Sequence, residues 1–246
     1  MRRYGLIGYP LEHSFSKDYF TAKFKREKID AVYENFSIKS VDEMPSLVKK
    51  YPDLKGLNVT LPYKTEVMKY LDLIDEKALR VGAVNVINIS IKAGKRILEG
   101  YNTDVDGFVL SLKPLIGRGI TRALVLGTGG ASRAVQAGLD DLGIKYSLVS
   151  RDKEKTGLTY RDLSDEMISS CQLLVNATPL GMFPNTESAP DIPYSSLKKD
   201  CILFDLVYNP DRSRFLKLGQ ERGCRIKNGR EMLHIQAEKA WEIWER

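Results

Sequence analysis

The sequence has 246 residues, 43% of them hydrophobic and 28% charged, which is typical of a globular protein with one large domain or two small ones. No apolar run approaches the roughly 20 residues that a membrane-spanning helix needs, and the N-terminal apolar stretch is too short for a signal peptide, so we expect a cytoplasmic protein. The net charge of +6 is spread over interspersed basic and acidic residues, which favours small anionic ligands over nucleic acid.

The first hundred residues alternate strand-like and helix-like segments, which favours a mostly parallel sheet. Strands are expected at residues 3–9, 31–38, 54–60, 83–91 and 96–101, the last two forming a pair joined through Ala93-Gly94. Helices are expected up to about residue 28 after a loop at 10–16, from 40 to about 52, and over 64–73. Ser40 and Glu43 hold the two positions of a capping box at the start of the second helix.

A helix over residues 103–115 leads into a second alternating block. Strands are expected there at residues 123–126, 146–150, 173–176, 202–207 and 225–227. Helices are expected at 131–142, 164–170 and 212–222, and a last helix at 229–246 carries apolar residues at helical spacing. The overall prediction is an α/β protein.

Residues 123–134 combine a buried strand, a glycine-rich turn and a helix N-terminus. The free amide groups of a helix's first turn and the helix dipole attract an anion, and Gly127, Gly129 and Gly130 let a pyrophosphate approach the backbone. The pattern departs from G-x-G-x-x-G, because Ser132 takes the third glycine position. The stretch therefore predicts a dinucleotide site, and a glycine-rich turn of some other α/β domain is the alternative.

The position of the glycine-rich turn indicates which part of the chain binds the nucleotide. Residues 104–225 have the size of a Rossmann nucleotide-binding domain, whereas residues 1–103 lack a phosphate-binding turn and are the natural substrate-binding catalytic domain. The last helix follows the nucleotide unit, so we expect residues 226–246 to return to the first domain and complete it.

The second strand of the nucleotide unit indicates which dinucleotide is bound. NAD-binding units place an acidic residue at the end of that strand, but here the strand ends at Ser150 and Arg151, with Lys155 one helical turn later. Arginine binds a 2′-phosphate in bidentate fashion, which favours NADP over NAD. The neighbouring Asp152 argues against this choice, and a solvated Arg151 is the alternative.

Two polar clusters in the first domain are candidates for chemistry, at residues 58–64 and 100–104. A desolvated lysine beside a carboxylate can give or take a proton near neutral pH, which makes Lys64 and Asp104 a candidate pair. Spacing alone equally fits a surface lysine and a first-turn helix acid. Three distant cysteines and two histidines lack the spacing of a metal site, so no metal is expected.

Taken together, eight motifs in one order resemble the shikimate dehydrogenase family along nearly the whole chain. The motifs are at residues 8–16, 58–64, 82–85, 102–104, 127–133, 176–182, 205–210 and 229–236. The resemblance implies NADPH-dependent reduction of 3-dehydroshikimate to shikimate, on an N-terminal α/β substrate domain completed by the C-terminal helix and a Rossmann domain.

The resemblance also implies a role for individual residues. Lys64 would donate the proton to the reduced carbonyl oxygen, with Asp104 orienting it, and His13 would be structural. Substrate contacts would come from Ser14, Ser16, Asn58, Thr60, Asn85, Tyr208 and Gln236. Cofactor contacts would come from Gly127, Gly129, Gly130, Ala131, Ser150, Arg151, Lys155, Thr178, Leu206, Gly229 and Met232. At three of these positions a purely structural role is the alternative: core packing for Met232, a strand-end turn for Thr178 and an exposed helix position for Gln236.

Three other functions stay open at this point. The family often has Asn-Arg-Thr where this chain has Ser150-Arg-Asp152, so a broader quinate/shikimate dehydrogenase using NAD is one alternative. Another NADP oxidoreductase, such as a methylenetetrahydrofolate dehydrogenase, is disfavoured by the Ser14/Ser16 loop and Gln236. A non-catalytic shikimate sensor could dispense with Lys64 or Asp104, and both are present. The partner is a small molecule, and the chain is expected to be a monomer or a homodimer.

Overall fold

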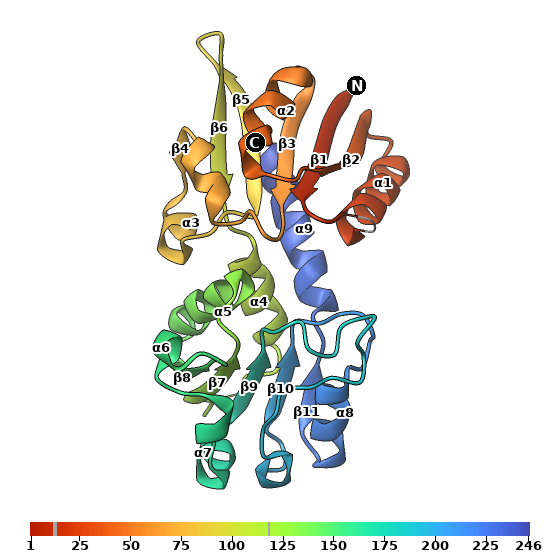
Figure 1. Ribbon diagram of the computed structural model, residues 1–246. Helices are drawn as coiled ribbons and strands as arrows, with labels where there is room; N and C mark the ends of the chain where they lie inside the picture. The colour runs from red at the N-terminus through yellow and green to blue at the C-terminus, as the bar shows by residue number, and fades with distance from the viewer. Residues whose placement is uncertain (12–13, 118) are drawn as a thin grey trace. The chain divides into compact units, whose positions relative to one another are not determined.

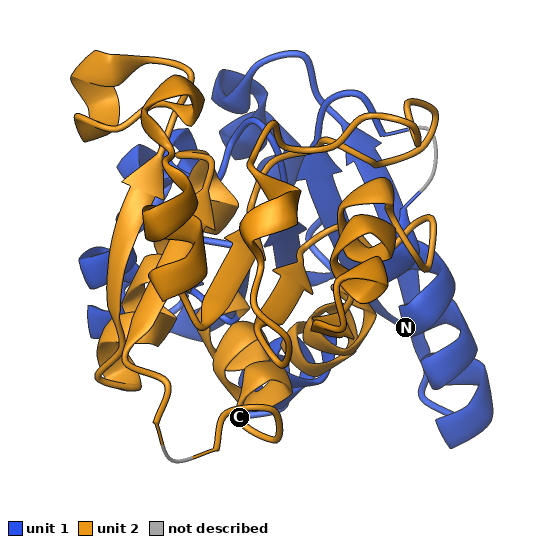
Figure 2. Ribbon diagram, turned by 90° about the horizontal axis from the view of Figure 1, so that it is seen from below, with its two compact units in different colours: residues 1–103, 237–246 blue, residues 104–236 orange. Residues whose placement is uncertain are grey.

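The computed structural model describes residues 1–11, 14–117 and 119–246. These residues form two compact units, Met1–Thr103 with Ala237–Arg246, and Asp104–Gln236 (Figure 2). The C-terminal helix α9 (Arg230–Trp244) contributes its first residues to the second unit and the rest to the first. The sequence places this return at residue 226, whereas the compact units change at Ala237, because Gly229 lies against Leu206 and Met232 packs in the cluster around Phe108.

The first unit is built on a six-stranded sheet in the order β2-β1-β3-β5-β6-β4 (Figure 1). Its strands are β1 (Arg2–Gly8), β2 (Ala31–Ser37), β3 (Leu54–Val59), β4 (Leu73–Ile74), β5 (Val86–Lys92) and β6 (Lys95–Tyr101). The β1·β2, β1·β3 and β4·β6 pairings are parallel, and the β3·β5 and β5·β6 pairings are antiparallel. The predicted strand pair through Ala93-Gly94 is confirmed as the β5–β6 hairpin, with a positive φ at both turn residues.

The helices of the first unit are α1 (Phe15–Glu27), α2 (Met44–Lys50) and α3 (Glu76–Val81). The capping box at Ser40 and Glu43 is confirmed, although it opens a 3-10 turn, η1 (Val41–Glu43), ahead of α2. The helix predicted over residues 64–73 is wrong. That stretch forms a turn and the 3-10 segment η2 (Glu66–Tyr70), in which Val67 is buried and Met68 and Tyr70 pack against the same apolar cluster. Strand β4 and helix α3 were not predicted.

The last part of α9 belongs to the core of the first unit. Trp244 is 7% exposed, and its indole Nε1 donates to the carbonyl of Ile87 at 3.0 Å. A Cβ added to Gly56 of β3 would lie 2.2 Å from the same Nε1, so the backbone of β3 passes directly against the indole. This contact ties the C-terminal helix to the centre of the sheet.

The second unit has a five-stranded sheet in the order β11-β10-β9-β7-β8, and all four pairings are parallel, as expected for a Rossmann-type unit. Its strands are β7 (Arg122–Leu126), β8 (Lys145–Val149), β9 (Leu173–Asn176), β10 (Ile202–Asp205) and β11 (Arg225–Lys227). Besides the start of α9, its helices are α4 (Asp104–Leu112), α5 (Gly130–Asp141), α6 (Lys153–Thr156), α7 (Asp165–Ser170) and α8 (Arg214–Glu221). Its 3-10 turns are η3 (Tyr160–Asp162) and η4 (Tyr194–Ser196), and neither these nor α6 was predicted.

Side chains of β7 alternate between two apolar clusters. Leu124 and Leu126 join the cluster that contains Phe215 of α8, whereas Ala123 and Val125 join the one that contains Phe108 of α4. Strands buried on both faces explain the continuous apolar runs of the sequence. Successive strands are added on one side of β7 up to β8 and on its other side from β9 onwards. The point at which the strand order reverses in this way is where open α/β sheets bind ligands.

In the part of the chain that the structure describes, no helix has both the length and the apolar character needed to cross a membrane. The same residues contain no cluster of three or more histidine, cysteine, aspartate or glutamate side chains that could hold a metal ion.

We predict that Gly56→Ala destabilises the first unit. The new methyl group would overlap the Trp244 indole, and overpacking of this kind costs about 1–3 kcal/mol. Thermal unfolding followed by circular dichroism measures the effect. Gly117→Ala is the control, since a Cβ there meets no atom within 4 Å. An equal loss of stability in both variants would contradict the packing argument.

Candidate cofactor and substrate sites

The turn between β7 and α5 is shaped by its glycines. Gly127 has a φ of +107°, and a Cβ there would lie 2.8 Å from Cγ2 of Thr178, so a side chain is excluded by both conformation and space. Gly129 is the N-cap of α5 and has no side-chain cap, and a Cβ on Gly129 or Gly130 would meet nothing within 4 Å. The start of α5 therefore has room beside it and no side chain that caps its first amide groups, as a phosphate site at a helix N-terminus requires.

Ser132, at the third glycine position, is fully buried. Its hydroxyl donates to the carbonyl oxygen of Gly127 at 2.7 Å and accepts from Gln136 Nε2 at 3.3 Å. The serine therefore fastens the first turn of the helix to the glycine turn, which explains how the motif tolerates the substitution.

A cavity of about 630 Å³ lies at the carboxyl ends of β7, β8 and β9, the switch point of the second sheet. Six of the predicted cofactor residues line it: Gly127, Gly129, Ser150, Arg151, Lys155 and Thr178. The other lining residues are Thr128, Asp152, Tyr160, Ala177, Pro179 and Leu180. Gly130 and Ala131 lie in the adjoining first turn of α5.

The outer wall of the cavity carries two cations and one carboxylate. Arg151 and Lys155 are exposed, as a 2′-phosphate ligand requires. Asp152 is the N-cap of α6: its Oδ1 accepts from the Glu154 amide at 3.1 Å, and its Oδ2 lies 3.7 Å from Lys155 Nζ. The carboxylate that argued against NADP is thus engaged by its own helix and partly neutralised by Lys155.

Tyr160 is a lining residue that the sequence analysis missed. Burial raises the pKa of its hydroxyl, and nearby Arg151 acts in the opposite direction. No motif or spacing identifies this tyrosine, since η3 reaches the cavity only through the fold.

A buried polar network holds the turn after β9. The Asn176 amide Nδ2 donates to Asp205 Oδ1 at 2.9 Å, while its Oδ1 accepts from the Thr178 hydroxyl at 2.6 Å. Asp205 also accepts from the Val207 amide at 3.0 Å and from the hydroxyl of Ser213. Asp205 is fully buried, and desolvation raises its pKa to about 6 against these hydrogen bonds. The network positions Thr178 at the cavity wall.

Besides Gly130 and Ala131, three predicted cofactor residues lie outside the cavity lining. A Cβ on Gly229 would stand 2.2 Å from the carbonyl oxygen of Leu206, so the two backbones touch. Met232 is 8% exposed and belongs to the apolar cluster around Phe108, as the core-packing alternative has it. Leu206 and Gly229 are therefore in contact with each other, but neither lines the cavity beside the glycine turn.

In the first unit, polar side chains meet where β3 ends, β5 begins and β6 ends. Asn58 is 4% exposed, and its Nδ2 donates to the Asn85 carbonyl at 3.4 Å. The Asn85 side chain accepts from the Thr103 amide at 2.8 Å and donates to the Thr103 hydroxyl at 2.9 Å. Antiparallel pairing of β3 with β5 and of β5 with β6 brings these three ends to one edge of the sheet.

The remaining predicted residues of the first unit lie around the same edge. Ser14 is the N-cap of α1: it accepts from the Lys17 amide at 3.2 Å and donates to Asn35 Oδ1 at 2.8 Å. Thr60 follows β3, and its amide donates to the Ile7 carbonyl at 2.9 Å. Lys64 is half-buried, and its own carbonyl accepts from the Val84 amide at 2.7 Å. Asn35 and Tyr33, which contacts Asn58, were not predicted.

Three other candidates are counted with the second unit. Asp104 is 7% exposed and lies in the first turn of α4, the position that the alternative role as a first-turn helix acid requires. Gln236 is 8% exposed rather than exposed, and its Nε2 donates to the Leu233 carbonyl at 3.0 Å. Tyr208 is half-buried, and burial raises the pKa of its hydroxyl. His13 lies outside the described residues.

The parallel sheet, the glycine turn and the cavity at the switch point define a Rossmann-type nucleotide-binding protein with a second α/β unit. The family model described as the shikimate dehydrogenase substrate binding domain matches residues 6–87. The chain is 39% identical over 264 residues to the shikimate dehydrogenase (NADP(+)) of Clostridium beijerinckii, covering 100% of this chain and 92% of that one. It therefore belongs to the shikimate dehydrogenase family.

Two solved structures are similar over nearly the whole chain. The shikimate 5-dehydrogenase of Thermus thermophilus in complex with NADP(H) and shikimate has a TM-score of 0.84 at 31% identity, covering 99% of this chain and 93% of that one. The shikimate 5-dehydrogenase of Listeria monocytogenes in complex with shikimate and NAD has a TM-score of 0.83 at 30% identity, covering 100% and 92%.

We predict that the stability of the second unit depends on the charge of Asp205. Folding raises the pKa of Asp205, so the folded state favours the protonated carboxyl group. The stability that this group contributes is fully present below its unfolded pKa and is lost as pH rises through about 6. Relative to Asp205→Asn, the wild type should lose about 1 kcal/mol of unfolding free energy between pH 5 and pH 7.5. Urea unfolding of both proteins at the two pH values measures this, and a constant difference would contradict the raised pKa.

Proposed function

We propose that this chain catalyses the reversible NADPH-dependent reduction of 3-dehydroshikimate to shikimate. The observation that carries the proposal is the cavity at the switch point of the second sheet, which combines a glycine turn open to a pyrophosphate with Arg151 and Lys155. Membership of the shikimate dehydrogenase family and the shikimate and NADP(H) bound by the Thermus thermophilus relative support the choice of substrate and cofactor.

The residues present fit NADP. The amide groups at Gly129 and Gly130 would bind the pyrophosphate, and Ser150, Arg151 and Lys155 would hold the 2′-phosphate. Gly127 and Thr178 would shape the wall, Ala131 would lie beside the pyrophosphate, and Leu206, Gly229 and Met232 would lie towards the nicotinamide. The bound cofactor supplies a hydride to the substrate carbonyl, and the protein contributes geometry and electrostatics.

The first unit would bind the substrate. Ser14 and Ser16, with Tyr208, would hydrogen-bond its carboxylate, and Asn58, Thr60, Asn85 and Gln236 would read the ring hydroxyls and the carbonyl. As the carbonyl oxygen gains negative charge it takes a proton, which we assign to Lys64, directly or through one water. Asp104 would orient Lys64 and bind a neighbouring hydroxyl. In this proposal residues 1–103 with the C-terminal helix form the substrate domain.

Two further parts of the proposal concern setting and assembly. The interspersed surface charges support a small-molecule partner rather than nucleic acid. A cytoplasmic location and a monomeric or homodimeric state complete the proposal, and sedimentation equilibrium distinguishes the two states.

A second candidate is a quinate/shikimate dehydrogenase that uses NAD. Asp152 favours it, since a carboxylate at the end of β8 can accept a ribose hydroxyl, and the Listeria monocytogenes relative was solved with shikimate and NAD. Absorbance at 340 nm with shikimate or quinate and NADP⁺ or NAD⁺ decides. Reduction with shikimate and NADP⁺ alone supports the proposal, and comparable rates with NAD⁺ or quinate support the broader enzyme. Shikimate binding without reduction would indicate a sensor.

We predict that Lys64→Ala lowers kcat by roughly 10²–10⁴-fold with little change in the affinity for shikimate, because general acid–base help is lost: Lys64 would accept the proton in shikimate oxidation and donate it in the reverse reduction. Steady-state kinetics at saturating NADP⁺ measure the change. The matched control is Lys69→Ala, which removes an exposed lysine of the same region that pairs with Asp42. A loss of tenfold or less for Lys64→Ala would exclude the catalytic role.

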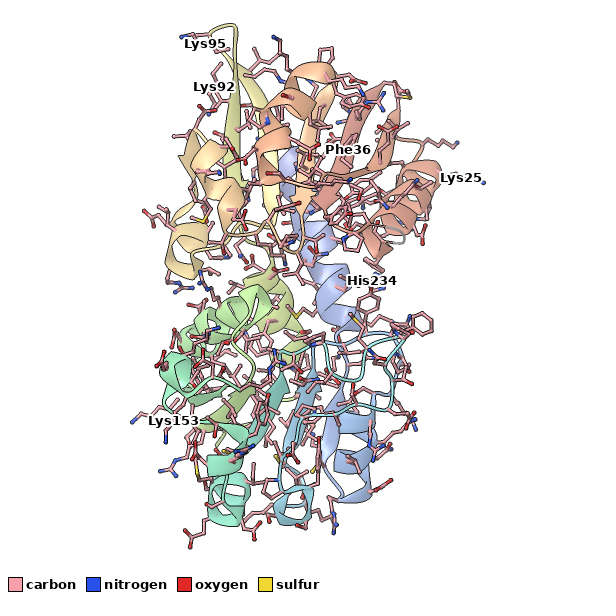
Figure 3. All side chains as sticks on the ribbon, in the orientation of Figure 1. Lys25, Phe36, Lys92, Lys95, Lys153 and His234 are labelled. Atoms are coloured by element: carbon pink, nitrogen blue, oxygen red, sulfur yellow. The ribbon has the colours of Figure 1, made fainter. Side chains whose placement is uncertain are left out.

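We predict that Arg151→Ala raises KM for NADPH more than KM for NADH, since the guanidinium would contact only the 2′-phosphate. Lys153→Ala is the control, because Lys153 is a nearby cation at the start of α6 that projects away from the unit and does not line the cavity (Figure 3). Equal effects of Arg151→Ala on the two cofactors would mean that Arg151 does not recognise the phosphate.

A further inference from the structure

Tyr33 occupies a fixed place in the core of the first unit. It lies on β2 opposite Tyr4 of β1, and it is 4% exposed. Its ring stacks on Phe20 of α1 with a centroid distance of 4.8 Å and an interplanar angle of 14°. The neighbouring position of α1 beside β2 is visible in Figure 1. This packing leaves the ring little freedom, so the position of its hydroxyl is set by the aromatic core.

The hydroxyl ends among residues proposed to bind the substrate. It donates to Asn58 Oδ1 at 2.6 Å, and both residues are buried. The side chain of Ser16 interacts with the same hydroxyl. Burial raises the pKa of Tyr33 well above its ordinary value, and Ser16 opposes this only in part, so the group remains a protonated donor throughout the physiological range.

This hydrogen bond determines which way the Asn58 amide faces. A carboxamide has an oxygen that accepts and a nitrogen that carries two N–H donors, and the two ends have nearly the same shape. A hydroxyl donor at 2.6 Å fixes the oxygen towards Tyr33, and Nδ2 then directs one N–H to the Asn85 carbonyl at 3.4 Å. The second N–H of Nδ2 is not used by this contact.

We propose that Tyr33 is a positioning residue that orients the Asn58 amide so that its nitrogen is presented to the substrate as a donor. The inference rests on the proposed function, since it takes Asn58 to bind shikimate. Tyr33 acts on affinity through Asn58 and takes no part in proton or hydride transfer. Without its hydroxyl, the buried Oδ1 loses its donor and the amide is free to turn over.

The test is a kinetic cycle on the full chain with shikimate and NADP⁺, using Tyr33→Phe, Asn58→Ala and the double variant. Phenylalanine keeps the ring and its stacking and removes only the hydroxyl. We expect Tyr33→Phe to raise KM for shikimate roughly tenfold, with kcat within about twofold and KM for NADP⁺ unchanged. In the Asn58→Ala background, the same substitution should have no further effect on KM.

Tyr63→Phe is the matched control. Tyr63 is equally buried in the same unit, but its hydroxyl donates to the Ile38 carbonyl at 2.7 Å rather than to a proposed substrate residue. Both phenylalanine variants should unfold at lower temperature, whereas only Tyr33→Phe should raise KM. An unchanged KM in Tyr33→Phe, a full effect in the Asn58→Ala background, or the same rise in Tyr63→Phe would each overturn the positioning role. If the wild type turns over shikimate, such a result overturns the positioning role of Tyr33 and leaves the proposed function intact. If the wild type neither turns over nor binds shikimate, the proposed function and the positioning role are both overturned.

Discussion

A polar group buried at the end of a strand has lost water and must find its partner inside the protein. Both sheets of this chain meet that requirement at the edge where ligands are expected. In the second unit, Asn176 and Asp205 bond each other and hold the backbone and hydroxyl of the next turn. In the first unit, the Asn58 side chain donates to the Asn85 backbone carbonyl, and the Asn85 side chain in turn accepts from the Thr103 amide. These buried polar side chains at the strand ends are therefore each fixed by a buried neighbour.

The two edges differ in what they leave open. At the glycine turn itself the donors are the backbone amides at the start of α5, and the absence of side chains at Gly129 and Gly130 leaves room beside them. Around Asn58 the capacity is in side-chain amides and hydroxyls. Backbone amides suit a phosphate, which needs several donors and little discrimination, whereas oriented side chains suit a ring with several hydroxyl groups.

Much of this arrangement can be predicted from the sequence. The strands of the second sheet follow from apolar runs, and the glycine turn and Arg151 indicate the cofactor cavity that they line. The stretch at residues 64–73 is different: Val67, Met68 and Tyr70 pack on the apolar core, but this pattern does not distinguish a 3-10 turn from an α-helix. Tyr160 and Tyr33 could not be found either. Tyr33 reaches Asn58 from a different strand, and Tyr160 follows Lys155 along the chain but belongs to no recognised motif, so neither gives a signal beyond that of an ordinary packed tyrosine.

Ser132 has a consequence for how such proteins are recognised. A search that requires glycine at all three positions of the dinucleotide motif passes over this turn. The structure shows that the third position accepts a small side chain, Ser132, whose hydroxyl donates to the Gly127 carbonyl. The third glycine of the motif allows the helix to pack closely on the strand, and a buried serine that bonds to the glycine turn also fits there, so sequences with serine at that position belong among the candidates for nucleotide binding.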